Sequence, residues 1–241
     1  MIKYLFILVV LSFILLYIYY ISQYSFEKYK LWKNIKINFN LTQFNNICGN
    51  ILVDFGDFSN NNIPNLYPKY TNKIKLKEWF SNDNLLLNDN NIQTRLFFYK
   101  ESTHPISLYL INWLYSIQNN LPTKLQNILN NKNIRIKFSL RISRNKWNYP
   151  NHFDVTNNFM IIISGDRNVI FDNNVHYILK PNDIIYFKQG TYHNFYCNNI
   201  NQLNMVFCIS YTDDYNKEID NLFIKFYNKQ NERIIKNIDF I

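Results

Sequence analysis

Three side chains have the residue types and the spacing of a metal site: His152, Asp154 and His193. One residue separates the first two, and His193 follows 39 residues after Asp154. Alternate residues of a β-strand point to the same face, so His-x-Asp can present two ligands together. Two imidazoles and one carboxylate form the facial triad that binds Fe(II) and leaves neighbouring coordination positions open. These open positions predict dioxygen chemistry with a 2-oxo acid that chelates the metal.

The same residues also have a purely structural interpretation. The segment 148–158 is rich in turn-forming residues, so His152 and Asp154 would lie in a surface turn. His193 would then be a hydrogen-bonded histidine at a rim. His176 lies in a predicted hairpin and is kept as a reserve ligand. The order of the motifs and the strands beside them favour the metal site.

The surrounding stretch has the hydrophobic pattern of short β-strands. Residues 134–142 alternate apolar and polar side chains with a period of two, which is typical of a half-buried strand. Short strands separated by turns, with no helical pattern between them, predict a sandwich or barrel. A double-stranded β-helix, which is a small jelly roll, fits the strand count, and its mouth is a natural ligand site. The further strands are expected at 158–164, 169–171, 175–179, 183–187 and 204–209.

The motifs between residues 134 and 211 occur in the order Tyr-Pro-Asn-His-Phe-Asp, Asn-Phe, Gly-Asp-Arg, Pro-Asn-Asp and Gly-Thr-Tyr-His. This order resembles the JmjC-like (cupin-8) branch of the 2-oxoglutarate oxygenases over about a third of the chain. The resemblance implies that His152, Asp154 and His193 bind Fe(II). It also implies that Arg167 stands where the family usually has the lysine that pairs with the distal carboxylate of 2-oxoglutarate.

The chain departs from the pattern of this family at three positions. Arg167 replaces the lysine, and a guanidinium can bind a carboxylate through two hydrogen bonds. Asn182 replaces the glycine of Pro-Gly-Asp, and asparagine is the next best residue for a left-handed turn. Lys188 stands where proline is common. None of these changes removes a metal ligand.

The resemblance implies an oxygenase that depends on Fe(II) and 2-oxoglutarate, with hydroxylation of a protein side chain ahead of demethylation and tRNA-base hydroxylation. The metal supplies the oxidative chemistry in such enzymes, and the protein orients the reactants. Asn158 and Tyr149 are expected as polar groups of the cofactor pocket. One alternative is a catalytically silent cupin-like module, used as a membrane-tethered binding protein or virion component. Another is a cupin that holds a different divalent metal without 2-oxoglutarate.

The remaining chain is expected to surround this core, which spans residues 133–212. Residues 25–132 are predicted to form a mixed helical region that packs on the barrel. Within it, 51–55 has the pattern of an early strand, and 106–129 has apolar residues at helical spacing with a proline that interrupts them. Residues 213–241 are expected to form a C-terminal helix, which either supports the barrel or serves as a homodimer face.

The N-terminal segment, residues 1–24, carries a long apolar run. Tyr4 to Ile21 comprises 18 residues without a charge and is interrupted only by Ser12. At about 1.5 Å per residue, a helix of this length approaches the hydrocarbon thickness of a bilayer. We therefore predict an uncleaved single-pass membrane anchor. A cleaved signal peptide is the alternative, but bulky residues occupy the place of a small-residue cleavage site. A buried core helix is a further alternative.

Charges beside this segment indicate its orientation. Lysines after the apolar run outnumber Lys3, and the positive-inside rule then places the globular part on the cytoplasmic side of a host or virion membrane. These are Lys28, Lys30, Lys33 and Lys36.

The composition sets wider limits. Hydrophobic residues make up 47% of the chain, which favours a folded core. The chain is rich in Asn, Ile and Lys and has only 4 Gly, a bias typical of an A/T-rich genome such as that of a large DNA virus or a protist. The net charge is +9, but the lysines are spread without a basic block, so nucleic acid is not an expected partner. Cys48, Cys197 and Cys208 are interpreted as free thiols, and a Cys197–Cys208 disulfide is the alternative.

Overall fold

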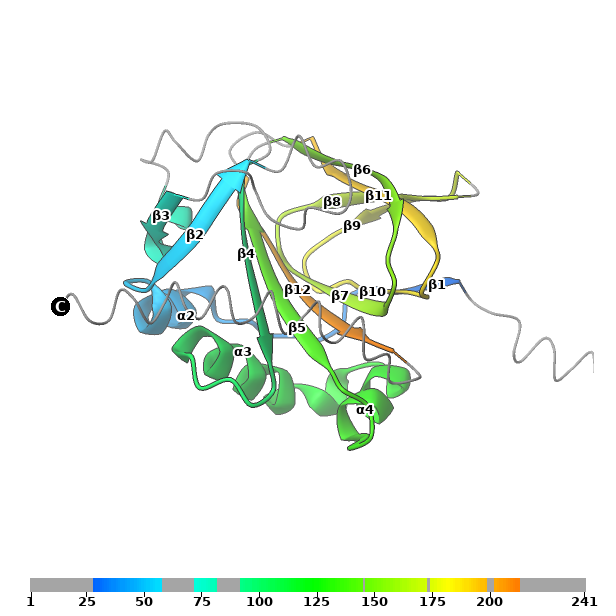
Figure 1. Cartoon of the computed structure of the whole chain (residues 1–241), viewed down its shortest axis with the longest axis horizontal. Coiled ribbons are helices and arrows are strands. Elements are labelled where there is room, and N and C mark those ends of the chain that lie inside the picture. Colours follow the sequence, from blue (N-terminus) through cyan, green and yellow to red (C-terminus); the bar gives the residue numbers. More distant parts are fainter. Residues whose placement is uncertain are drawn as a thin grey trace, which may run out of the picture.

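The computed structural model describes residues 28–57, 72–81, 92–144, 146–172, 174–198 and 202–212. Within them, the strands form a large and a small sheet that face each other, and helices lie against the outer face of the large sheet (Figure 1). The strands are β1 (Tyr29–Trp32), β2 (Leu52–Asp57), β3 (Asn72–Lys75), β4 (Ile92–Tyr99), β5 (Lys137–Ser143), β6 (Trp147–Phe153), β7 (Asn157–Ser164), β8 (Arg167–Phe171), β9 (His176–Leu179), β10 (Ile184–Phe187), β11 (Tyr192–Cys197) and β12 (Asn204–Tyr211). The helices are α2 (Leu41–Cys48), α3 (Pro105–Ser116) and α4 (Thr123–Asn130), with short 3-10 turns η1 (Leu76–Trp79) and η3 (Gln118–Asn120).

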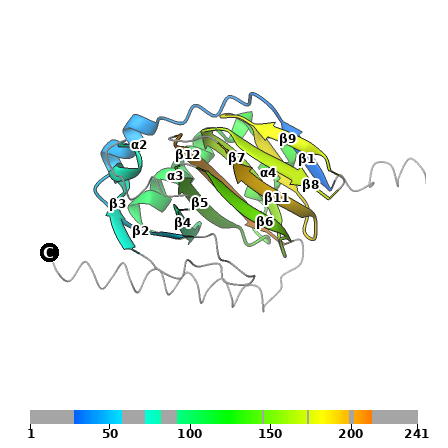
Figure 2. The same cartoon turned by 90° about the horizontal axis from the view of Figure 1, so that it is seen from above.

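Strands β5 to β12 have the order of a jelly roll. The large sheet runs β1-β10-β7-β12-β5-β4-β2-β3, and the small sheet runs β6-β11-β8-β9. Neighbouring strands are antiparallel throughout, and the chain passes repeatedly between the two sheets (Figure 2). A two-sheet antiparallel arrangement of this kind closes a short barrel. The prediction of a mainly-β fold is confirmed, and so is the hairpin of β8 and β9.

The region before the barrel contributes more strand than its sequence pattern indicates. β1 pairs with β10 at one edge of the large sheet, and β4, β2 and β3 extend the other edge beyond β5. The early strand predicted at 51–55 is confirmed as β2. The predicted helical segment is also confirmed, as α3 and α4, and Pro122 stands at the N-cap of α4 where the pattern is interrupted.

Two apolar clusters follow from the alternation of side chains across the large sheet. On β5, Phe138, Leu140 and Ile142 belong to the cluster beneath the helices, which also contains Leu110 and Leu114 of α3. The other cluster fills the space between the sheets. It is built from both of them and includes Trp147, Met160, Ile162, Val169, Phe171, Phe187, Phe195, Val206 and Cys208. Because both faces of the large sheet are covered at its centre, the strands β5, β7, β10 and β12 are largely buried on both sides.

Among the turns of the barrel with a left-handed backbone, two bear on the sequence pattern. Asn182, which precedes β10, has φ of 75°, as its place in the Pro-Asn-Asp turn predicts. Gly165, between β7 and β8, has φ of 74°, and a Cβ there would lie 2.5 Å from the Leu203 carbonyl oxygen. Only glycine fits this second turn without a shift of the neighbouring backbone.

Several predictions concern residues outside the described ranges. The proposed anchor at 4–21 and the C-terminal helix at 213–241 both lie there. The helices in the described part of the chain are all too short or too polar to cross a bilayer. Cys48, Cys197 and Cys208 are buried and free, so the Cys197–Cys208 disulfide does not form.

Candidate metal centre

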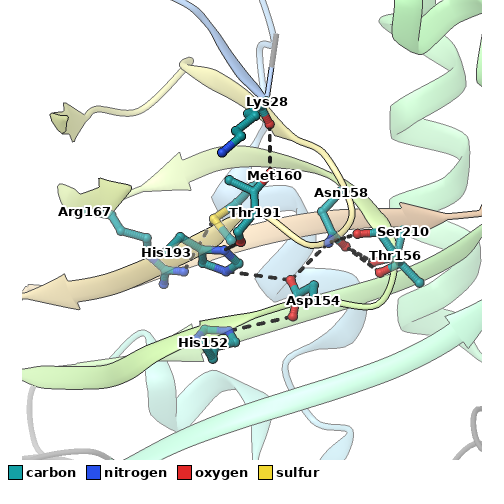
Figure 3. Close-up of polar contacts among 10 residues, drawn as sticks. All are labelled: Lys28, His152, Asp154, Thr156, Asn158, Met160, Arg167, Thr191, His193 and Ser210. Atoms are coloured by element: carbon teal, nitrogen blue, oxygen red, sulfur yellow. Dashed lines mark hydrogen bonds and ion pairs between the residues drawn. The ribbon is translucent and has the colours of Figure 1, made fainter. Parts of the chain in front are cut away.

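The three predicted ligands lie together on neighbouring strands of the small sheet. β6 carries His152, Asp154 follows its last residue, and β11 places His193 directly opposite His152. The Nε2 atoms of His152 and His193 lie 3.7 and 3.8 Å from the two carboxylate oxygens of Asp154 (Figure 3). One ligand atom from each residue lies within 4.8 Å of the others, and no other such group occurs in the described residues. A single ion can therefore contact all three.

The ring of His193 is held in the orientation that a metal ligand requires. Its Nδ1 lies 2.8 Å from the Thr191 carbonyl oxygen. A carbonyl can only accept, so Nδ1 carries the proton and Nε2 keeps its lone pair. The side chain is 1% exposed. Burial lowers the pKa of His193, and the attraction of Asp154 opposes this only in part. The neutral imidazole that binds metals is thus favoured.

Asp154 is oriented by a hydrogen-bond network from the large sheet. Its Oδ2 accepts a hydrogen bond of 3.0 Å from Asn158 Nδ2 (Figure 3). Asn158 Oδ1 in turn accepts from the hydroxyl groups of Ser210 and Thr156. Asn158 was predicted as a group of the cofactor pocket, and its contacts here are with the carboxylate ligand and its supports. Such outer contacts fix the geometry of a ligand and tune its basicity.

Tyr149, the other predicted pocket group, packs on a ligand. Its ring meets that of His152 edge to face, with centroids 4.4 Å apart. The guanidinium of Arg95 lies 4.9 Å from the centroid of the Tyr149 ring and donates to Gln93 Oε1. Tyr149 therefore links a buried cation of β4 to the triad.

Arg167, which the resemblance assigns to the co-substrate, lies between the two sheets. It is 2% exposed, and its guanidinium stacks 4.5 Å from the centroid of a Trp147 ring. Its Nη1 lies 3.8 Å from the sulfur of Met160, while its buried Nε has no hydrogen-bond partner (Figure 3). Burial lowers the pKa of Arg167 to about 9. A buried cation with an unsatisfied donor is costly unless an anion joins it.

The sequence pattern missed a further arginine that faces this space. The period-two pattern of 134–142 predicts a half-buried strand, whose polar side chains would normally face solvent. Arg141 lies on β5 opposite Val206 of β12, and Val206 belongs to the cluster between the sheets. Arg141 therefore faces the barrel interior too. The alternation of residue types contained this information, but it could not show that a second sheet covers the polar face.

The reserve ligand lies elsewhere. His176 on β9 is exposed, and its Nε2 lies 3.1 Å from Asn168 Oδ1 and 3.3 Å from the Tyr196 hydroxyl. It is not part of the clustered ligands.

The loop before β11 is tied to the first described residue. Both the backbone N–H of Lys188, at 2.7 Å, and the hydroxyl of Thr191, at 3.2 Å, donate to the Lys28 carbonyl oxygen. Lys28 Nζ also forms an ion pair of 3.0 Å with Asp172. The same Thr191 accepts the hydrogen bond from His193. The start of β1 thus supports the loop that orients His193.

Comparisons with known proteins match solved structures, all at low sequence identity. No protein-family model matches the sequence, and no curated protein does. Among solved structures, YcfD, a ribosomal oxygenase from Escherichia coli, is 13% identical, with 84% of this chain and 52% of that chain covered and a TM-score of 0.44. A cupin superfamily protein from Desulfitobacterium hafniense is 16% identical over 33% of this chain and 69% of that one, with a TM-score of 0.30.

A third similar structure has a different activity. The DMSP lyase DddQ from Ruegeria pomeroyi is 15% identical over 34% of this chain and 40% of that chain, with a TM-score of 0.30. The chain thus spans about half of the oxygenase and less than half of the lyase. The structural neighbours of this mainly-β chain are cupin and jelly-roll proteins, among them a ribosomal oxygenase.

Proposed function

We propose that this protein is an Fe(II)- and 2-oxoglutarate-dependent oxygenase. The observation that carries the proposal is the convergence of His152, Asp154 and His193, two imidazoles and one carboxylate, in a barrel whose interior also holds a buried arginine. This donor set suits Fe(II) with neighbouring positions left for other ligands. The site is accessible, since the side chains of Asp154 and His152 are 30% and 11% exposed.

The residues present fit both the metal and the co-substrate. His193 offers Nε2 in a fixed tautomer, and Asn158 holds the carboxylate of Asp154. Bound iron would supply the activation of dioxygen that the side chains cannot provide. Arg167 would hold the distal carboxylate of 2-oxoglutarate through its free Nε, in surroundings that exclude water and strengthen the pair. The substrate that we propose, a protein side chain, rests on the family resemblance alone.

The decisive test is an anaerobic Fe(II) titration followed by a succinate-release assay with candidate peptides. We expect one Fe(II) per chain and succinate release that requires both iron and 2-oxoglutarate. Metal binding without turnover would favour a cupin that uses another divalent metal. Absence of metal binding would favour the catalytically silent, membrane-tethered module.

We further propose that residues 4–21 anchor the protein in a membrane, with the barrel on the cytoplasmic side. The full-length chain should stay in the pellet through carbonate extraction, and deletion of residues 1–24 should release soluble protein. The reason is that burial of an 18-residue apolar helix far exceeds the strength of a peripheral association. Full-length chain in the soluble fraction, or a mature N-terminus near residue 22, would contradict the anchor.

A further inference from the structure

Three arginines converge between the two sheets. Arg95 of β4 and Arg141 of β5 are directly opposite each other on neighbouring strands. Like charges in this arrangement repel. Arg167 approaches from the small sheet, with its Nη1 beside the sulfur of Met160, and Met160 pairs with Cys208 on β12. The interior of the barrel therefore holds three cations contributed by both sheets.

Little negative charge from the protein balances them. Burial lowers the pKa of Arg95 to about 10, and the positive charge of Arg141 acts in the same direction. Burial acts on Arg141 as well, but attraction to Cys208 and Asp154 outweighs it, and the pKa of Arg141 is raised. Within the described part of the chain, Asp154 is the only carboxylate that affects the pKa of any of the three arginines. This excess of positive over negative charge inside the barrel suits an anionic ligand.

Two of the arginines have a buried Nε–H group that could donate a hydrogen bond to a ligand. The Nε atoms of Arg141 and Arg167 are buried and have no hydrogen-bond partner, whereas Arg95 donates to Gln93. Arg141 lies directly opposite Arg95, whose guanidinium is 4.9 Å from the centroid of the Tyr149 ring, and that ring packs on His152, so Arg141 is on the side of the barrel that holds the triad. Arg167 lies farther along the barrel, on the Trp147 ring. One donor is thus on the strand beside Arg95, and the second is on a guanidinium stacked over Trp147, which lies five residues before His152 on β6.

We infer that Arg141 is a second carboxylate-binding residue, which holds the metal-proximal carboxylate of a dicarboxylate whose distal carboxylate lies at Arg167. This inference rests on the proposed function and adds to it a direct contact between the protein and the end of the co-substrate that faces the metal. Arg95 does not need to touch the ligand, because its charge strengthens the positive potential while it holds Tyr149. The chain would then recognise both carboxylates with its own side chains, before any contribution from the metal.

Succinate and butyrate test this directly, since they share a four-carbon chain and differ by one carboxylate. Calorimetric titration would use the metal-free, full-length protein in detergent, in chloride buffers of equal ionic strength. We expect succinate to bind at least about tenfold more tightly than butyrate, which is the effect of one additional charge-assisted hydrogen bond. If Arg167 alone bound carboxylates, the second carboxylate of succinate would gain only the general positive potential of the site, and the preference for succinate would stay well below tenfold.

Variants of the arginines test which residue binds the second carboxylate of succinate. Arg141→Met should reduce the preference for succinate to less than about threefold, and Arg141→Lys should restore part of it, since both changes act on one charged contact. Arg167→Met should weaken the binding of both acids. Arg135→Met is the matched control, because Arg135 is an exposed arginine near the start of β5, and it should leave the preference unchanged.

Folding is checked in the same samples. Arg141→Met removes one of three mutually repelling charges, so the ligand-free variant should unfold at the same or a higher temperature than the parent. Equal affinity of the parent for the two acids, or a preference that survives Arg141→Met, would overturn this inference and leave the proposed function standing. A clear preference in a protein that never releases succinate from 2-oxoglutarate would support the two-arginine site and overturn the proposed function.

Discussion

Replacement of His152 or Asp154 by alanine is expected to abolish high-affinity Fe(II) binding and succinate release, with the β-core still folded. Loss of a residue that merely supports a ligand typically costs about 10- to 100-fold in metal affinity, so loss of a ligand should cost more. Both side chains are partly exposed, and their truncation leaves no large internal cavity. His193 is a poorer first choice, because it is fully buried among Phe187 and Phe195.

Isothermal titration with Fe(II) under anaerobic conditions measures the loss of metal binding, and an assay of succinate release measures the loss of turnover. His176→Ala is the matched control, since it removes an exposed imidazole on the same sheet and should change neither quantity. A full-strength Fe(II) isotherm in both His152→Ala and Asp154→Ala would exclude the triad as the metal site. Turnover retained by Asp154→Ala alone would indicate a more open, halogenase-like centre.

Replacement of Arg167 by alanine should raise the apparent constant for 2-oxoglutarate by well over tenfold, while Fe(II) affinity barely changes. Removal of one partner from a buried, charge-assisted pair costs about 2–4 kcal/mol. The free Nε of Arg167 and its position over Trp147 leave its guanidinium ready to receive a carboxylate. Steady-state succinate release as a function of 2-oxoglutarate concentration measures the change.

Arg167→Lys should recover much of the lost affinity, since lysine is the usual residue of the family that this sequence resembles. It should not recover all of it, because a lysine ammonium cannot form the two parallel hydrogen bonds of a guanidinium. A 2-oxoglutarate dependence in Arg167→Ala that equals that of the parent would leave the metal site intact but remove its assigned co-substrate.

Local rules predicted a large part of this fold. The period-two pattern and the turn residues located β5, β7, β8, β9, β10 and β12 but not β6 and β11, which carry the two histidines. The left-handed Asn182 could be inferred from the motif in which it stands. The edge strands β1 and β3 were missed, because each is only 4 residues long and takes its structure from pairing with a distant segment. The β-strand propensity of four residues has a weaker effect than such tertiary contacts.

The candidate site, like the fold, could be predicted from the sequence only in part. His152, Asp154 and His193 could be proposed together because sequence motifs carry ligand types and spacing. No motif indicated that Asn158 would hold Asp154, since their hydrogen bond joins side chains across a turn. Arg141 was missed for a related reason: whether a polar face meets water or a second sheet is decided by topology.

The ties between Lys28 and the loop before β11 have a consequence for where the protein can act. Six residues lie between Ile21, the end of the proposed anchor, and Lys28, so seven Cα–Cα steps join the two. A chain extends at most about 3.6 Å per residue, so this link spans no more than about 25 Å. The loop bonded to Lys28 precedes His193. The proposed reaction centre would therefore stay close to the lipid surface. Substrates would then be limited to those that are themselves membrane-bound or delivered to that surface.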